Sequence, residues 1–469
     1  MVDIAVVGAG TMGAGIAESA ALAEMSVVML DVNGDALDRG RQTIEKDLDR
    51  RVKKGRLSEE EREQVLGRIS MTTSIEDCAG APLVVEAVVE DMEIKKKVFA
   101  DLEGVTVGDA VLATNTSSLS VAGIATATEV PERVVGMHFF NPVPAMRLVE
   151  VVSGTSTDPA AMRRAEEIAE RLGKTPIRVS DTPGFVVNRV ARPFYLEALR
   201  LVEAGGEPGQ VDAAIRGAGF RMGPLELADL IGQDINLTVS ESLYERSYGQ
   251  PRFRPSPLQR GMVEAGLLGR KTGKGFYDYG ASADEGEERP ASESNPDDIT
   301  VVGDAELART LGAASDSGGV RILALEDGQM AAGSGFEVGV RRLASDIPVV
   351  EIAGETDEET RDRVGSLIRA AGLVPAWVPD LPGGAALRVV AAVVNEAAFA
   401  LTEGVADAED IDRAMQLGAN YPKGPLAWAD EIGLDRIVRT LDALRDIYGD
   451  AYACAPLLRQ RHALNRPMS

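Results

Sequence analysis

Cysteine and histidine are nearly absent from this chain of 469 residues, which contains two of each. Cys78 and Cys454 cannot build the disulfide framework of a small secreted domain, and we expect both to be reduced. Neither cysteine has the spacing to further ligands that a zinc site requires. The sequence therefore argues against a disulfide-stapled fold, and we expect no metal.

Positive charge is also scarce. The chain has 49 lysines and arginines against 74 aspartates and glutamates, which gives a net charge of -25 and a pI of about 4.6. This balance argues against nucleic acid or an anionic membrane as a partner. Seven of the ten lysines are Lys53, Lys54, Lys95, Lys96, Lys97, Lys271 and Lys274. These positions predict either the docking of a polyanionic ligand or, equally well, solvated helix faces.

A long hydrophobic run is missing as well. No stretch approaches the length of a transmembrane span, and no basic segment precedes the first apolar residues, so no secretory signal is predicted. We expect a cytoplasmic protein. A chain of 469 residues is too long for a single core, so we expect two to four domains.

A glycine-rich loop stands between a strand and a helix at the start of the chain. The apolar residues 4–7 lead into Gly8, Ala9, Gly10, Thr11, Met12 and Gly13, then a helical stretch, then a strand at 27–30 that ends in Asp31. The three glycines permit a tight turn, the approach of a pyrophosphate to the backbone, and close packing of helix on strand. Asp31 would accept hydrogen bonds from both ribose hydroxyls and repel a 2′-phosphate. The motif therefore predicts a site for NAD rather than NADP.

Three further polar side chains follow apolar runs typical of buried strands. Glu90, Ser117 and His138 come after the runs 83–87, 111–113 and 134–137. Ligands bind outside the carboxyl ends of parallel strands, so these side chains should converge on one crevice. A histidine at a strand end, with the carboxylate of Glu150 on a neighbouring strand, is suited to act as a general base near neutral pH. The alternatives are a structural histidine and, for Ser117, a turn residue.

In combination these motifs resemble the L-3-hydroxyacyl-CoA dehydrogenase family of fatty-acid β-oxidation. The resemblance covers residues 1–280 and rests on GAGTMGAGIA with Asp31, VVEAVVED with Lys95, ATNTSSLS, GMHFFNPVPAMRLVEVV, DTPGFVVNRV, GPLELADLIGQD and LLGRKTGKGFYDY. It implies the NAD-dependent oxidation of an (S)-3-hydroxyacyl-CoA to the 3-oxoacyl-CoA.

The resemblance implies four catalytic residues. His138 would take the proton of the 3-hydroxyl group, and Glu150 would orient His138 and stabilise its charge. Ser117 would contact substrate and nicotinamide. Asn188 would help to hold the substrate oxygen.

Binding residues are implied in the same way. Glu90, Lys95 and Asn141 correspond to cofactor contacts. Lys54, on a polar helical segment at 33–70, corresponds to a CoA contact, and Lys95 is also expected near the substrate. Asp47 stands where the family has a small hydroxyl residue, which weakens a CoA contact from that position.

The order of the motifs predicts five segments. We expect an α/β Rossmann NAD-binding domain with a helical arm (1–182), an all-α substrate and dimerisation domain (183–280) and a linker rich in charge, Ser and Pro (281–298). A degenerate Rossmann-like module (299–380) and a second all-α domain of the same type (381–469) should follow.

The degenerate module differs from the first domain at its functional positions. Residues 299–303 resemble the first strand, but Asp304-Ala305-Glu306 replaces the phosphate loop, and its carboxylates would repel a pyrophosphate. Glu351 resembles Glu150, yet no histidine lies between residues 303 and 380. We therefore predict that this module binds no nucleotide and holds no equivalent base.

The second helical domain keeps packing signals and loses a functional residue. The pattern at 223–234 recurs at 424–435, whereas Asn188 aligns with Leu387. We expect a structural role, as a pseudo-dimer partner within the chain, with a homodimer as the alternative. The whole layout resembles the long 3-hydroxyacyl-CoA dehydrogenases of phenylacetate degradation, whose substrate would be 3-hydroxyadipyl-CoA.

Two other functions stay open at this point. The first is a dehydrogenase of a free hydroxy acid, as in the gulonate dehydrogenase and lambda-crystallin branch, although Lys54 and Lys95 favour CoA. The second is a non-catalytic NAD-binding protein, which the presence of Ser117, His138 and Glu150 disfavours.

Overall fold

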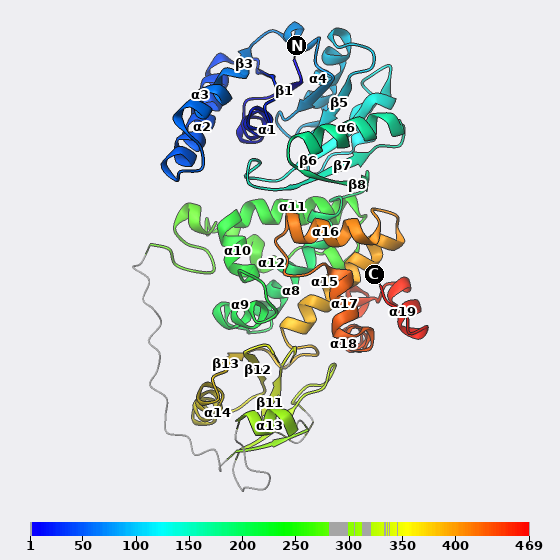
Figure 1. Ribbon diagram of the computed structural model, residues 1–469. Coiled ribbons are helices and arrows are strands. Elements are labelled where there is room, and N and C mark those ends of the chain that lie inside the picture. Colours follow the sequence, from blue (N-terminus) through cyan, green and yellow to red (C-terminus); the bar gives the residue numbers. More distant parts are fainter. Residues whose placement is uncertain are drawn as a thin grey trace. The chain divides into compact units, whose positions relative to one another are not determined.

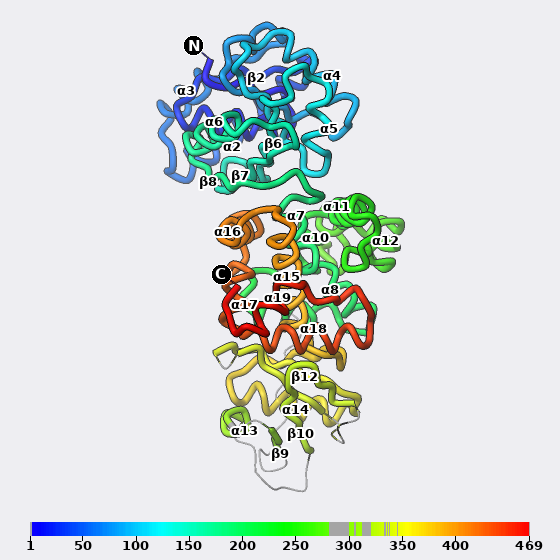
Figure 2. Tube along the Cα trace, turned by 90° about the vertical axis from the view of Figure 1, so that its right-hand side faces the viewer, coloured from blue at the N-terminus to red at the C-terminus, as the bar shows by residue number. Residues whose placement is uncertain are grey.

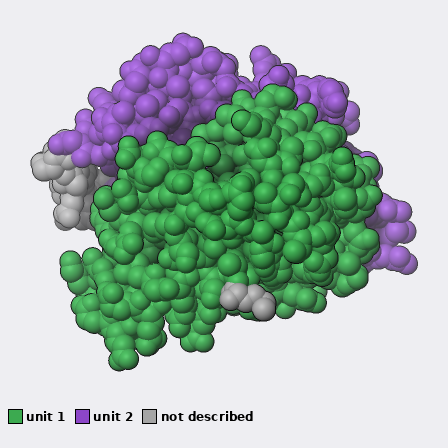
Figure 3. Space-filling view, turned by 90° about the horizontal axis from the view of Figure 1, so that it is seen from above, with its two compact units in different colours: residues 1–189, 403–419 green, residues 190–402, 420–469 purple. Residues whose placement is uncertain are grey.

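The computed structural model describes residues 2–280, 299–303, 305–311, 320–332, 334, 336, 338–344 and 346–468. They form two compact units, Met1–Arg189 with Glu403–Ala419, and Val190–Thr402 with Asn420–Ser469, which Figure 3 colours separately. The predicted linker 281–298 and Asp304 lie outside the described residues.

An eight-stranded sheet forms the centre of the first unit (Figure 1), in the order β3-β2-β1-β4-β5-β6-β7-β8. Its strands are β1 (Ile4–Val7), β2 (Val27–Leu30), β3 (Ile69–Thr72), β4 (Leu83–Glu86), β5 (Val111–Thr114), β6 (Val134–Phe139), β7 (Leu148–Ser153) and β8 (Thr175–Ser180). All neighbouring strands are parallel except β6 and β7. Most strands are continuous buried apolar runs, as a parallel sheet covered on both faces requires.

Helices accompany this sheet, and their starts agree with the sequence signals. Asp158 caps its helix through the N–H of Ala160, and Ser58 forms a capping box with Glu61. The helices are α1 (Thr11–Leu22), α2 (Gly34–Lys53), α3 (Glu59–Gly67), η1 (Ile75–Cys78), α4 (Met92–Val105), α5 (Val121–Ala125), η2 (Pro131–Arg133), α6 (Pro159–Arg171), α7 (Val187–Val190) and α16 (Ala408–Gly418).

The predicted helical arm packs along one stripe. Leu37, Ile44 and Leu48 of α2 are buried in the same hydrophobic core as α1 and the sheet. They recur at helical spacing, so the apolar content of α2 is low but confined to one face. The opposite face of the helix is left to solvent and carries most of its charges.

Helices dominate the second unit. They are α8 (Arg192–Glu203), α9 (Pro208–Arg216), α10 (Pro224–Ile231), α11 (Gln233–Arg246), η3 (Pro251–Phe253), α12 (Pro257–Glu264), η4 (Arg270–Thr272), α15 (Ala386–Thr402), α17 (Pro425–Ile432), α18 (Leu434–Tyr448), η6 (Gly449–Tyr452) and α19 (Pro456–Ala463). The repeat seen in the sequence has a structural counterpart: α10 and α17 both begin with Pro after a glycine cap and both end at a glycine with positive φ, Gly232 (109°) and Gly433 (97°).

The second unit also contains a five-stranded sheet, in the order β13-β12-β11-β10-β9. Its elements are β9 (Ile299–Val302), α13 (Ala305–Leu311), β10 (Val320–Ala324), β11 (Val338–Arg341), β12 (Val349–Ala353), α14 (Glu358–Ala370) and β13 (Val374–Trp377). Only β11 and β12 are antiparallel. This pattern is that of β4 to β8, so β9 takes the place of β4.

The prediction that residues 299–303 repeat the first strand is therefore wrong. Two short buried parallel strands look alike in sequence, and only their neighbours in the sheet tell them apart. The equivalents of β1, α1 and β2, which carry the glycine loop and Asp31 in the first unit, have no counterpart among the described residues of this module. The absence of nucleotide binding by this module stays a prediction. Its reason is now that the described residues include no equivalent of β1, α1 and β2.

Each helical repeat contributes one helix to the sheet of the other half of the chain. A helix of the second repeat packs on the eight-stranded sheet, and a helix of the first repeat packs on the five-stranded sheet. In the first unit, α16 lies along β7 and β8, and Ser180 Oγ donates to the carbonyl of Gly404 (Figure 2). In the second unit, α9 lies along β12 and β13, and the N–H of Trp377 donates to Gln210. The two halves of the chain thus exchange equivalent helices.

Candidate active site

His138 and Glu150 face each other across the antiparallel pair β6 and β7. They are directly opposed in register, and His138 Nδ1 lies 2.6 Å from Glu150 Oε2. Both side chains are buried. Since a carboxylate accepts, Nδ1 carries the proton and Nε2 is left as the basic nitrogen. The rings of Phe140 and Phe185, with centroids 4.5 and 5.7 Å from the imidazole, restrict its orientation.

The second oxygen of Glu150 links this pair to the start of α7. Oε1 accepts the N–H groups of Val186 and Val187, each at 2.9 Å. Asn188 follows directly and is half-buried. One fully buried carboxylate therefore fixes both His138 and the backbone that presents Asn188.

Ser117 stands at the end of β5 beside Glu90. Glu90 Oε1 accepts the N–H of Ser117 at 3.0 Å and the hydroxyl of Thr116 at 2.5 Å. Burial by itself would raise the pKa of Glu90, but the charge of Lys95 and these hydrogen bonds hold it below its ordinary value. Glu90 is thus an anion that shapes the loop, while Ser117 Oγ makes no hydrogen bond within the described part of the chain.

Lys95 lies deeper than a ligand contact would require. Its side chain is 1% exposed, and its ammonium group lies 2.7 Å from Glu86 Oε1 and 3.3 Å from Glu90 Oε2. Glu86 also accepts the N–H of Val88 and the hydroxyl of Thr114. The sequence did not single out Glu86, although a carboxylate at the end of a buried strand was a usable signal.

The glycine loop has the shape that a dinucleotide needs. A Cβ at Gly8, where φ is +105°, would lie 2.7 Å from the carbonyl of Ala87, and one at Gly13 would lie 1.8 Å from that of Gly8. A Cβ at Gly10 would meet nothing within 4 Å, so space remains above this residue for a phosphate. Gly10 caps α1 without a side-chain hydrogen bond, which leaves the helix N–H groups for the ligand. Thr11 and Met12 form the first turn, and the residues present fit NAD.

Asp31 closes this cradle. Its Oδ2 accepts the N–H of Ala9 at 2.8 Å, and its Oδ1 accepts that of Asn33 at 3.1 Å. The carboxylate is held at the end of β2, next to the glycine loop, where the ribose is expected.

Asn115 and Asn141 flank the end of β6 in different ways. The side chain of Asn115 accepts the N–H of Phe139 at 2.9 Å and so fixes the backbone next to His138. Asn141 is exposed. Asn115 was missed by sequence reasoning, because a polar residue after a strand is an ordinary turn signal.

Lys54 is exposed at the end of α2, whereas Asp47 turns inward. Asp47 Oδ2 accepts from Arg51 Nε at 2.8 Å, and Arg51 also approaches Glu18 at 3.4 Å. Burial and the adjacent Asp47 raise the pKa of Glu18 to about 8. Burial also lowers the pKa of Lys174 to about 8. Asp47 therefore belongs to a partly buried charge cluster with Arg51 and Glu18, while Lys54 is exposed and can meet a ligand.

The same constellation recurs in the second sheet with one exchange. Glu351 accepts the N–H groups of Ala385 and Ala386, as Glu150 accepts those of Val186 and Val187. Its cross-strand partner is Arg341, at the position of His138. The sequence had identified Glu351 but not Arg341.

Comparisons with known proteins agree with this arrangement. Residues 3–182 match the model of the 3-hydroxyacyl-CoA dehydrogenase NAD binding domain, and residues 184–279 and 383–467 match that of the 3-hydroxyacyl-CoA dehydrogenase C-terminal domain. The chain is 41% identical to 3-hydroxyadipyl-CoA dehydrogenase of Escherichia coli K12, over 98% of this chain and 97% of that protein. It is 47% identical to a probable 3-hydroxybutyryl-CoA dehydrogenase of Deinococcus radiodurans, over 58% of this chain and 99% of that protein. A crystal structure of 3-hydroxybutyryl-CoA dehydrogenase from Escherichia coli K12 has a TM-score of 0.90 and 40% identity, and covers 99% of this chain and 98% of its own.

Proposed function

This chain belongs to the 3-hydroxyacyl-CoA dehydrogenase family and is an NAD-dependent oxidoreductase, and from that premise we propose that it oxidises 3-hydroxyadipyl-CoA. The observation that carries the proposal is the likeness over nearly the full length of both chains to a relative named for that substrate. The second candidate is 3-hydroxybutyryl-CoA, because a crystal structure of equal coverage bears that name. The relatives named above give no support to a free hydroxy acid as substrate.

In this proposal His138 is the general base. Its Nε2 takes the proton of the substrate's 3-hydroxyl group, while Nδ1–H donates to Glu150. The imidazolium formed in this step is stabilised by the Glu150 carboxylate, which stays fixed by two backbone N–H groups. When bound, NAD supplies the acceptor for the hydride.

Ser117 and Asn188 position the substrate in this scheme. The Ser117 hydroxyl and the Asn188 amide make no side-chain hydrogen bond within the described residues, so both can contact the reacting oxygen or its neighbours. The backbone at Asn188 is also restrained by its neighbour Arg189, which is buried and whose Nη1 lies 2.8 Å from Glu403 Oε2. Donors held in place before the reaction cost little reorganisation when charge develops.

The cofactor and CoA contacts divide between direct and indirect ones. We assign direct contact with NAD to Gly8, Gly10, Gly13 and Asp31, together with Ala9, Thr11, Met12, Glu90 and Asn141. Lys95 acts through Glu90, since its ammonium group is enclosed by two carboxylates. Lys54 is left as the cation on the arm that can meet the CoA phosphates.

The second half of the chain is proposed to be a pseudo-dimer partner, with the five segments bounded as predicted from the sequence. The support is the exchange of equivalent helices, in which α16 packs beside β7 in the first unit and α9 beside β12 in the second. The second-repeat helix therefore lies against the strand that carries Glu150. A homodimer of the whole chain is the alternative. No helix in the described part of the chain is both long and apolar enough to cross a bilayer, and the cytoplasm is our proposal for its location.

The substrate is tested by following NADH oxidation with 3-oxoadipyl-CoA and with acetoacetyl-CoA under the same conditions. We expect a higher kcat/KM for 3-oxoadipyl-CoA. A preference for acetoacetyl-CoA would establish the second candidate instead. No turnover of either compound, despite NADH binding, would refute an acyl-CoA substrate.

A further inference from the structure

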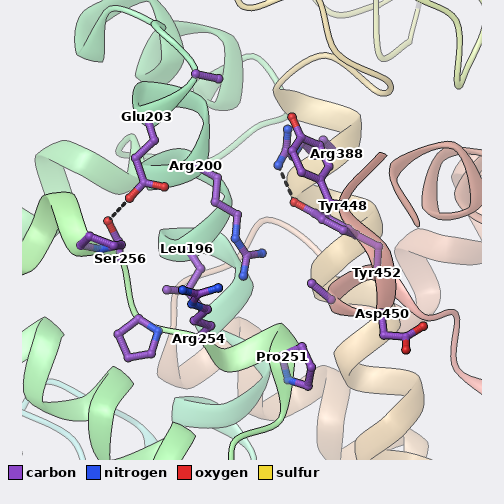
Figure 4. A pocket seen from close by; sticks show the side chains of 14 residues that line it. Leu196, Arg200, Glu203, Pro251, Arg254, Ser256, Arg388, Tyr448, Asp450 and Tyr452 are labelled. Carbon is purple, nitrogen blue, oxygen red and sulfur yellow. Dashed lines mark hydrogen bonds between the residues drawn. The ribbon is translucent and has the colours of Figure 1, made fainter. Parts of the chain in front are cut away.

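A pocket of about 590 Å³ lies among the helices of the second unit (Figure 4). It is bordered by α8, by the segment 251–257, by Arg388 near the start of α15, and by the end of α18 with η6. Its volume is in the range of small-molecule sites. None of the residues assigned above to catalysis or to NAD lines it.

Three arginines line this one pocket from two helices and a loop. Arg200 comes from α8, Arg254 from the segment before α12, and Arg388 from α15. Figure 4 shows the side chain of Arg200 between α8 and Tyr452, with Arg254 lower in the view, near Leu196. Such a cluster is unexpected in a chain whose net charge is -25.

The carboxylates nearby compensate these charges incompletely. Arg200 and Arg388 share a single carboxylate, Glu197, and Arg254 forms no ion pair within the described part of the chain. Of the two acids that line the pocket, Asp450 is paired with Arg445, and Glu203 accepts the hydroxyl of Ser256 at 2.5 Å. Three guanidinium groups thus stand beside two carboxylates, Glu197 and Glu203, so positive charge is in excess by one at this site.

Arg388 has an unused donor in this pocket. Its side chain is 1% exposed, its Nε donates to Glu197 at 2.6 Å, and its Nη2 donates to Tyr452. Its Nη1 has no acceptor among the described residues. A buried donor without an acceptor destabilises the protein, and an anionic ligand would supply the missing acceptor.

The pocket is not a feature that both helical repeats share. The repeat offset of 199 places Phe399 at the position of Arg200, and the offset of 201 places Ser247 and Pro251 at those of Tyr448 and Tyr452. Arg388 does have a counterpart, because the offset of 199 places it on Arg189. Packing needs common to both repeats therefore do not explain Arg200, Tyr448 and Tyr452.

We propose that this pocket binds a small organic anion, whose carboxylate or phosphate oxygens are held by Arg200, Arg254 and Arg388. Tyr448, whose ring lies 5.2 Å from the Arg388 guanidinium, and the prolines of the segment 251–257 provide an apolar wall for the ligand's carbon body. This site goes beyond the proposed dehydrogenase function and does not depend on it.

Isothermal titration of the full chain, saturated with NAD, tests the site with three probes: adipate, AMP and inorganic phosphate. Adipate binding identifies a carboxylate ligand, and AMP or phosphate binding identifies a phosphate ligand. Arg254→Gln should weaken the bound probe at least about ten-fold, the loss expected for a charge-assisted hydrogen bond. Arg254 is exposed, so this variant should fold and keep its dehydrogenase kcat.

Two matched variants separate this pocket from other anion sites. Arg369→Gln removes an exposed arginine of α14 that does not line the pocket, and Lys54→Gln removes the cation proposed to meet CoA. Both should bind the probe as the wild type does. The proposal is overturned if none of the three probes binds at a probe concentration of about 10 mM, because a site formed to hold such an anion should bind it more tightly than that. It is equally overturned if Lys54→Gln weakens binding and Arg254→Gln does not.

Discussion

Arg341 holds in the second sheet the position that His138 holds in the first. Each is paired directly across an antiparallel strand pair with a buried glutamate, Glu351 or Glu150, whose oxygens accept two consecutive backbone N–H groups. An arginine is always charged and cannot accept a proton. The replacement of histidine by arginine therefore keeps the strand pair and its buried glutamate but removes the base. The degenerate module is thus a copy of the catalytic frame without its chemistry.

His138→Gln should abolish most turnover and leave cofactor binding intact. Glutamine can fill the space but cannot take a proton, and the loss of an acid–base group lowers the rate by about two to four orders of magnitude. Steady-state kcat and an NADH titration check this, with one NADH per chain in both proteins. His462→Gln is the control, because that histidine lies in α19 of the other unit. Wild-type turnover in His138→Gln would falsify the mechanism.

Glu18→Gln should flatten the pH dependence of stability. The pKa of Glu18 is raised from 4.5 to about 8, first by burial, so between these values the folded protein holds a proton that the unfolded chain has lost. The free energy of unfolding therefore falls as pH rises through this window, by about 1.4 kcal/mol per pH unit from this group. Urea unfolding at several pH values should show a shallower decline for Glu18→Gln. The exposed Glu24→Gln should retain the wild-type slope, and equal slopes in all three proteins would contradict the assignment.

Gly418→Ala should lower both stability and kcat. A Cβ at Gly418, the last residue of α16, would lie 2.6 Å from Leu148 Cδ2 and 2.9 Å from Val187 Cγ2. Leu148 is on the strand of Glu150, and Val187 donates its N–H to that carboxylate, so the clash displaces the support of His138. Overpacking of this kind costs about 1–3 kcal/mol. The KM for NADH should not change.

Gly261→Ala is the matched control for Gly418→Ala, since a Cβ there meets nothing within 4 Å. It should keep the wild-type kcat and should not lower the thermal midpoint, since alanine is favoured over glycine inside a helix such as α12. If Gly418→Ala behaves like Gly261→Ala, the second repeat does not support the active site.

Arg341→Met should destabilise the protein without changing kcat. It removes the nearby charge that opposes the rise in the pKa of the buried Glu351, and it leaves the carbonyls of Glu326 and Gln329 without their guanidinium donor. Losing the partner of a buried polar group costs about 1–3 kcal/mol. The double variant Arg341→Met, Glu351→Gln should recover part of the loss in thermal midpoint. A fall in kcat/KM in folded Arg341→Met would show that the second module takes part in catalysis.

The sequence by itself determined the features that depend on neighbours in the chain. The strand, glycine loop, helix and Asp31 follow one another, and they predicted the Rossmann domain and its cofactor correctly. The caps at Ser58 and Asp158 are equally local, because a cap bonds only to the next few residues. The role of His138 as general base was inferred from its place at the end of a strand and from Glu150, twelve residues later. The turn between β6 and β7 places these two residues opposite each other.

Only the tertiary structure decided which distant groups meet. Residues 299–302 and 4–7 are alike as short apolar runs, and their places in the two sheets, set by pairing with other strands, show that they are not equivalent. The burial of Lys95 between two carboxylates, the pairing of Arg341 with Glu351, and the arginine pocket all join residues far apart in the sequence. Local patterns carry no record of such partners, because the same side chain is stable in many settings until packing selects one.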